Sequence, residues 1–243
     1  MFVTCLVDLA FPDVGESTAL LLQDLGFEVV VPLAQTCCGQ PAFNSGFTDE
    51  ARRVGRTLLD AFAGAQAVVA PSGSCTAMVR TRFPSLFAGT RDAERAARLA
   101  SRTWELSEFL VDVARVPSIA GTFSARVTVH DACHGLRELG LRDQTRTLLA
   151  GIDGVELVEM PRADACCGFG GTFSVRAPEV ATAMADDKLA NVRTSGADVV
   201  VSGDVGCLMH LGGRATRRGS PTRFAHVAEV LAEARGLRRP APA

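Results

Sequence analysis

Apolar and polar positions along the first half of the chain predict strands that alternate with helices. Short continuous apolar runs predict buried strands over Phe2–Val7, Phe27–Val31 and Ala67–Ala70. Between these runs, apolar residues recur at helical spacing and predict helices over Glu16–Leu25 and Thr48–Phe62. This order of elements is typical of βαβ units, which form parallel sheets.

The second half of the chain repeats the same order. Strands are predicted over Val127–His130, Val155–Glu159 and Val199–Val201, and helices over Arg142–Ala150 and Pro178–Arg193. The expected fold class is therefore α/β, with two pseudo-symmetric βαβ-type halves that contain parallel sheets. Loops that follow parallel strands meet at one end of a sheet, and we expect functional residues there.

Sequence matches between the halves indicate an internal duplication. Residues 65–75 match residues 197–207, and residues 105–110 resemble residues 226–231. The expected domains are residues 1–120 and 121–243, with the boundary near Pro117 to Phe123. An Ala-, Arg- and Glu-rich stretch over residues 81–115 predicts one or two further helices.

The cysteines show the duplication most clearly. They form two quartets, in which the second member follows the first by 32 and 33 positions and is itself followed at once by a third cysteine and a glycine. The first quartet is Cys5, Cys37, Cys38 and Cys75, and the second quartet is Cys133, Cys166, Cys167 and Cys207. We interpret each quartet as four thiolates that folding gathers at one point, at the loop end of its half.

The amino-acid composition limits which cellular compartments and which classes of ligand we expect for this chain. The chain has 243 residues, 47% apolar residues and a net charge of −2, which leaves no basic field for nucleic acid. No apolar stretch approaches the length of a membrane helix, and no basic flank accompanies the apolar start as in a secretory signal. We therefore expect a cytoplasmic protein without a transmembrane segment, in which disulfides are disfavoured. Eight cysteines then indicate metal binding or redox chemistry.

Four thiolates at one point suit an iron–sulfur cluster or a tetrahedral zinc. Adjacent cysteines diverge and suit an object with several metal atoms, so an iron–sulfur cluster is the favoured cofactor. Zinc at one site and metal-free thiol redox chemistry remain the alternatives. Gly39 and Gly168 follow the two pairs, permit backbone conformations closed to other residues, and are expected to bring amide groups to the cofactor.

Two histidines are candidate catalytic residues. His134 directly follows Cys133, and His210 lies three positions after Cys207, where helical spacing would place it on the same face. Either could bind a metal or carry a proton, whereas His134 could also serve only as a hydrogen-bond donor. The first half has Met78 where the second has His210, so we expect the second site to be the active one. Asp204 is expected to cap the helix after it.

The doubled Cys-Cys-Gly pattern resembles a family of proteins with two cysteine-rich CCG domains. This family includes a cysteine-rich component of heterodisulfide reductase and the iron–sulfur subunit of glycolate oxidase. The stretch from Asp204 to Gly213, together with the chain length, resembles most closely the lactate utilisation protein A family. The resemblance spans nearly the whole chain, from Cys5 to Leu231.

The resemblance implies a 4Fe-4S redox subunit in a multi-protein complex that oxidises L-lactate to pyruvate, with the eight cysteines as cluster ligands. It implies two partners, a companion iron–sulfur protein and a third subunit, and the 2-hydroxy acid could bind in a partner. The fullest family motif has a fifth cysteine, three positions before the last one, but Ser72 and Asp204 stand there. A heterodisulfide-reductase-like thiol/disulfide subunit and a zinc-stabilised, non-catalytic scaffold are the alternative functions.

Overall fold

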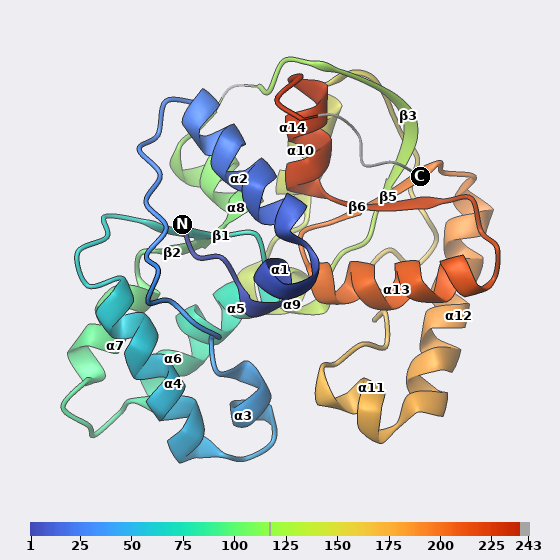
Figure 1. Cartoon of the computed structure of the whole chain (residues 1–243). Coiled ribbons are helices and arrows are strands. Elements are labelled where there is room, and N and C mark those ends of the chain that lie inside the picture. The colour runs from blue at the N-terminus through green and yellow to red at the C-terminus, as the bar shows by residue number, and fades with distance from the viewer. Residues whose placement is uncertain (117, 239–243) are drawn as a thin grey trace.

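The computed structural model describes residues 1–116 and 118–238, which we call the first lobe and the second lobe (Figure 1). Pro117, where the expected domain boundary begins, lies outside the described residues. The first lobe contains, in order, α1 (Cys5–Ala10), α2 (Pro12–Asp24), α3 (Gln40–Asn44), α4 (Thr48–Ala61), β1 (Val68–Ala70), α5 (Gly73–Ala77), the π-helical turn η1 (Met78–Arg82), α6 (Phe83–Leu86), α7 (Ala93–Ala100), β2 (Thr103–Glu105), α8 (Leu106–Glu108) and the π-helical turn η2 (Phe109–Val113).

The second lobe carries the larger sheet. It contains β3 (Thr122–Val129), α9 (Cys133–Leu139), α10 (Asp143–Ala150), β4 (Asp153–Leu157), α11 (Thr172–Arg176), α12 (Pro178–Ser195), β5 (Val199–Ser202), α13 (Val205–Arg217), β6 (Arg223–His226) and α14 (Val227–Ala234). Its four strands lie in the order β4-β3-β5-β6, and those of the first lobe form the pair β1-β2. Every pairing is parallel, so the predicted α/β class with parallel sheets is confirmed.

Two strands predicted in the first lobe are wrong. The apolar run Phe2–Val7 becomes a helix from Cys5 onward, and only the amide of Phe2 bonds toward β1, at 2.8 Å from the carbonyl of Val69. A short apolar run fits a buried strand and a helix equally well, so its periodicity could not decide. The predicted strand Phe27–Val31 has no regular secondary structure and lies outside both described sheets, and Val30 is 60% exposed there.

The remaining predicted elements appear with shifted ends. The stretch over residues 81–115 was predicted to form one or two helices, and it contains the three helices α6, α7 and α8, the π-helical turn η2 and the unpredicted strand β2. In the described residues, no helix is both long and apolar enough to cross a membrane.

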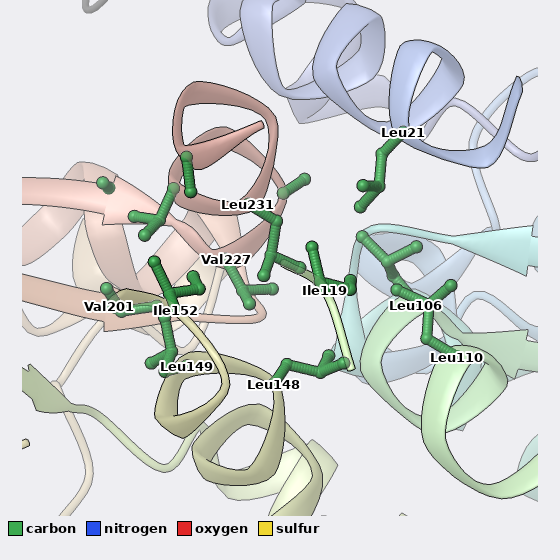
Figure 2. Close-up of a cluster of buried hydrophobic side chains, with 14 of the residues drawn as sticks. Leu21, Leu106, Leu110, Ile119, Leu148, Leu149, Ile152, Val201, Val227 and Leu231 are labelled. Carbon is green, nitrogen blue, oxygen red and sulfur yellow. The ribbon is translucent and has the colours of Figure 1, made fainter. Parts of the chain in front are cut away.

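One hydrophobic core joins the two lobes. Leu21 of α2 and Leu106 of α8 pack in the same buried cluster as Leu148 of α10 and Leu231 of α14 (Figure 2). Helix α2 packs against α14, although the two lie at opposite ends of the chain (Figure 1). The duplicated halves therefore bury their apolar faces against each other.

The first turns of two helices repeat between the lobes. Glu105 caps α8 and His226 caps α14, and each forms a capping box with a glutamate three residues later. The matched positions seen in the sequence thus have matched roles. This repeat also gives a register for comparing the two lobes residue by residue.

Candidate metal centre

Helix N-terminal ends bring the leading and trailing cysteines together. Cys5 and Cys133 are the first residues of α1 and α9, and Cys75 and Cys207 are the third residues of α5 and α13. The adjacent pairs lie in the loops before α3 and α11. Cys5 therefore starts a helix instead of lying inside a strand. Helix N-termini carry partial positive charge, which favours thiolates beside them.

In the first quartet, the sulfurs lie close in two pairs. The Sγ atoms of Cys5 and Cys37 are 3.6 Å apart, and those of Cys38 and Cys75 are 3.4 Å apart. Hydrogen bonds from the thiols of Cys38 and Cys5 lower the pKa of Cys37 to about 3. Hydrogen bonds to Cys37 and Cys75, together with burial, raise the pKa of Cys38.

The second quartet has the same arrangement. The Sγ atoms of Cys133 and Cys166 are 4.0 Å apart, and those of Cys167 and Cys207 are 3.1 Å apart. The thiols of Cys133 and Cys167 lower the pKa of Cys166 to about 2. Each quartet thus places one readily ionised thiol among three others, and a bound cation would favour ionisation of the rest.

The glycines after the pairs fit the expectation for their backbone. Gly39 and Gly168 have φ of +82° and +90°, and each donates its amide to the sulfur two residues before it at 3.4 Å. Both glycines also lie against a helix, since an added Cβ would lie 3.2 Å from the carbonyl oxygen of Ala51 or 2.5 Å from that of Ala181. Only glycine combines this conformation with this close approach.

Both quartets open into one cavity of about 420 Å³. Its lining includes all eight cysteines, namely Cys5, Cys37, Cys38, Cys75, Cys133, Cys166, Cys167 and Cys207. Among the described residues, Asp204 and His134 are the acid and the histidine in this lining, which contains neither lysine nor arginine. The sequence predicted two separate sites, whereas in the structure both quartets line the same cavity.

Asp204 links the two lobes at this cavity. Its Oδ1 accepts the amide of Gly206 at 3.1 Å and so caps α13, as predicted. Its Oδ2 accepts the amide of Ser74, in the first lobe, at 2.8 Å. The carboxylate thus caps α13 and joins the N-terminal ends of the two helices that carry the trailing cysteines.

The donors in each quartet fit an iron–sulfur cluster. Such clusters are held by cysteine thiolates and tuned by hydrogen bonds to their sulfurs, and both features are present here. A tetrahedral zinc, with Zn–S bonds of about 2.3 Å, needs donors about 4 Å apart. Among the described residues, the one set of three donor atoms that all lie within 4.8 Å of one another is formed by His130, Cys167 and Cys207. The first quartet contains no such set, so its sulfurs fit a cluster of several metal atoms better than a single zinc ion.

The two predicted histidines lie in different surroundings. His134 lines the shared cavity and lies 3.8 Å from the carboxylate of Glu138. His210 lies on α13, where its Nε2 is 3.2 Å from the carbonyl oxygen of Ala181 and its ring lies beside Phe169. His210 lines a separate hollow with Phe169 and is not part of the lining of the shared cavity.

Two buried polar residues near the second quartet were not predicted as site residues. His130 is 2% exposed and belongs to the donor set given above. Lys188, the only lysine of the chain, is 1% exposed and donates to the carbonyls of Arg162 and Ala163 at 2.8 and 2.7 Å. A lone lysine in the middle of a predicted helix was the signal that could have identified it.

Comparison with known proteins assigns a class to this double site. The family model for the CCG cysteine-rich domain matches the chain twice, over residues 1–80 and 127–212. These two ranges contain the first and the second quartet respectively. The fold and the site are thus those of a protein with two CCG cysteine-rich domains.

Full-length relatives carry a more specific name. The chain is 47% identical to lactate utilization protein A of Geobacillus kaustophilus over 95% of this chain and 97% of that protein. It is 44% identical to lactate utilization protein A of Oceanobacillus iheyensis over 95% of both chains, and 46% identical to that of Geobacillus thermodenitrificans over 95% of this chain and 97% of that one. The chain belongs to the lactate utilization protein A family.

Proposed function

We propose that this chain is a 4Fe-4S redox subunit of a multi-protein system that oxidises L-lactate to pyruvate. The single observation that carries the proposal is the pair of thiol quartets around one cavity, in a chain whose relatives are named for lactate utilization. Cys5, Cys37, Cys38 and Cys75 would hold one cluster. Cys133, Cys166, Cys167 and Cys207 would hold the other.

The residues around the sulfurs support an electron-transfer role. Oxidation of lactate to pyruvate releases two electrons, and a cluster in each quartet would supply two one-electron acceptors. The amides of Gly39 and Gly168 donate to sulfur, which stabilises negative charge at the ligands. The sulfurs of Cys38 and Cys167 are buried, which keeps water from part of each site.

The lining of the cavity supports a substrate site in a partner. A carboxylate such as lactate is usually held by arginine or lysine. Among the described residues, neither type lines the cavity, whereas Asp204 does and would repel an anion. We infer that a companion iron–sulfur protein and a third subunit complete the system, and that lactate binds to one of these. The chain would then act in the cytoplasm.

The proposal is tested on protein purified without oxygen. We expect about four irons and four sulfides per filled quartet, and a paramagnetic signal after reduction. With the companion proteins present, L-lactate should generate that signal and D-lactate should not. Cys37→Ser and Cys166→Ser should each remove the metal of one quartet. Protein that contains neither iron nor sulfide would contradict the proposal.

A thiol–disulfide reductase is the second candidate. The shared cavity favours it, because a disulfide placed there would have sulfur ligands on two sides. Reduction of a disulfide to two thiols by the isolated protein, with two electrons from an added chemical reductant and without any signal from lactate in the full assembly, would support this function. About one zinc per quartet with no visible absorption would instead indicate a zinc-stabilised scaffold.

A further inference from the structure

The buried residues near the sulfurs differ between the two lobes, as a comparison of equivalent positions in the duplicated halves shows. Counting from the leading cysteines, His130 takes the place of Phe2. Counting from the alanines that contact Gly39 and Gly168, Lys188 takes the place of Leu58. All four side chains are buried, with exposed fractions of 2% or less. The second lobe thus has an imidazole and an ammonium where the first lobe has a phenyl ring and a leucine.

His130 is fixed by its backbone and unsatisfied at its ring. Its amide donates to the carbonyl of Val201 at 2.8 Å, and its carbonyl accepts the hydroxyl of Ser202 at 3.0 Å. Neither ring nitrogen has a hydrogen-bond partner of normal geometry within the described residues, although the backbone of Ala163 lies near the ring. Leaving a buried polar group without a partner costs about 1–3 kcal/mol, so this ring needs a reason to be there.

The ring of His130 lies close to two sulfurs of the second quartet. A ring nitrogen of His130 and the Sγ atoms of Cys167 and Cys207 all lie within 4.8 Å of one another. In the described chain, no three donor atoms of the first quartet lie within 4.8 Å of one another, and the phenyl ring of Phe2 has no donor atom. Two thiolates and an imidazole are ligands shared by zinc and by iron.

Lys188 is the second buried polar group beside the second quartet. Lys188 itself donates to two backbone carbonyls, which leaves it engaged elsewhere. The charge of Lys188 would also offset part of the negative charge of a four-thiolate site.

We propose that His130 supplies a nitrogen ligand to the metal centre of the second quartet, beside Cys167 and Cys207. The two sites are then chemically different, with sulfur ligands alone in the first lobe and mixed sulfur and nitrogen ligands in the second. This inference rests on the proposed function only in requiring a metal at the second quartet. That metal is either an iron of a cluster or a zinc ion, since both accept this donor set.

A buried water is the competing explanation. His130 also lines a small cavity of about 30 Å³ with Glu105 and Gly135, and a space of that size holds one water. A water there would satisfy the ring without any metal bond. The experiment must therefore detect the nitrogen–metal bond itself.

The test uses anaerobically purified full-length protein, with its iron, zinc and sulfide content measured first. X-ray absorption at the edge of whichever metal is found should show an imidazole at about 2.0–2.1 Å. For an iron cluster, pulsed electron paramagnetic resonance should show a nitrogen coupling that changes when only histidine is labelled with ¹⁵N. This second readout needs no variant.

Two variants assign the signal. His130→Phe copies the residue of the first lobe, so the packing has a precedent; it should abolish the imidazole signal and release the second-lobe metal to a chelator at least 10-fold faster. His226→Asn is the matched buried control, because asparagine still caps α14. It should leave both measurements unchanged.

The outcomes separate this inference from the proposed function. Iron and sulfide without a nitrogen coupling, or an imidazole signal that survives in His130→Phe, overturn the inference and leave the proposed function standing. Metal confined to the first quartet also overturns the inference. Absence of all metal overturns both.

Discussion

At the scale of the residue, the glycine after each cysteine pair is required by its surroundings. Gly39 and Gly168 share a positive φ, but Gly168 is the more tightly enclosed. An added Cβ at Gly168 would lie 2.5 Å from the carbonyl oxygen of Ala181 and 2.9 Å from the Cβ of Met184. At Gly39 the nearest atom would be 3.2 Å away. The second Cys-Cys-Gly loop is therefore the less tolerant of change.

This difference predicts a ranking of alanine substitutions. Gly168→Ala should destabilise the fold by about 3–4 kcal/mol, because steric overlap adds to backbone strain. Gly39→Ala should cost about 1–2 kcal/mol, mainly from strain. Gly46→Ala is the control, since Gly46 has φ of +83° with no atom within 4 Å of an added Cβ, and it should cost about 1 kcal/mol. Urea unfolding measures all three, and equal losses at Gly168 and Gly46 would contradict this account.

Lys188 is the second residue with an unusual position. Its ammonium donates to the carbonyls of Arg162 and Ala163, in the loop that leads into the second cysteine pair. Arg162 has φ of +53°, which a residue with a side chain rarely adopts. Lys188 therefore stabilises a strained turn in addition to placing charge near the sulfurs.

Replacement of this lysine should be costly even where the packing is kept. Lys188→Leu copies Leu58 of the first lobe but removes two hydrogen bonds from a charged donor, while each carbonyl keeps one backbone amide, from Ala165 or Asp131. We expect a loss of about 2–4 kcal/mol in urea unfolding. Arg53→Leu removes an exposed cation, 74% exposed in its side chain, and should change stability by less than about 0.5 kcal/mol. A loss at Lys188 no larger than at Arg53 would show that its hydrogen bonds do not matter.

At the scale of the element, the matched caps of α8 and α14 use different chemistry. Glu105 accepts the amides of Ser107 and Glu108 at 2.7 and 3.2 Å. His226 accepts the amide of Ala228 through Nδ1 at 3.1 Å, which requires a neutral ring. Burial lowers the pKa of His226 to about 4 and raises the pKa of Glu105 to about 8. The two caps therefore respond to pH in opposite directions.

The cap at Glu105 predicts a pH dependence of stability. Its pKa is raised from 4.5 in the unfolded chain to about 8 in the fold, so the folded state holds the proton more tightly. The stabilisation is complete below pH 4.5 and is lost as the pH rises through 8, with a slope of up to about 1.4 kcal/mol per pH unit. Glu105→Gln keeps an oxygen acceptor and removes the titration.

Urea unfolding at pH 6 and pH 8 checks this prediction. The wild-type chain should lose stability over this interval relative to Glu105→Gln, whose own change with pH should be smaller by about 1–2 kcal/mol. Glu94→Gln is the control, because Glu94 has an exposed side chain. Parallel pH profiles for the wild-type chain and Glu105→Gln would refute the role of this carboxyl.

At the scale of the whole molecule, the cysteine helices pack in crossed pairs. Helix α5 of the first lobe packs on α9 of the second, and α1 packs on α13. In the first pair, Gly73 would place a Cβ 3.3 Å from the backbone of Gly135. In the second pair, the matching positions are Val205 and Val7, which share a buried cluster. Each lobe thus carries its leading cysteine beside the trailing cysteine helix of the other.

The crossed packing predicts that a local change between the lobes affects the whole fold. Gly73→Val should force α5 away from α9 and destabilise the protein by about 2–3 kcal/mol. Gly64→Val, where an added Cβ meets no atom within 4 Å, should cost less than about 1 kcal/mol. Because the core is shared, fluorescence of Trp104 and circular dichroism should report one coincident unfolding transition. Two separate transitions would mean that the lobes are stable independently.

Much of the site could be predicted because it depends on the type and spacing of residues along the chain. The spacing of the cysteines predicted which sulfurs meet, and Asp204 was recognisable as a helix cap from its residue type and position. The strand predicted over Phe2–Val7 failed because a short apolar run suits two conformations. His130 was not identified as a site residue, because its meaning depends on Cys167 and Cys207, which are distant in sequence.

The sequence by itself determined the duplicated α/β plan and the membership of each quartet, because both depend on periodicity and on repeated spacing along one chain. Only the tertiary structure decided that the two quartets open into one cavity and that an imidazole lies behind the second but not the first. The physical reason is that the lobes pack through crossed helices and a common core. The distances between their sulfurs are therefore set by contacts between halves, which no local pattern records.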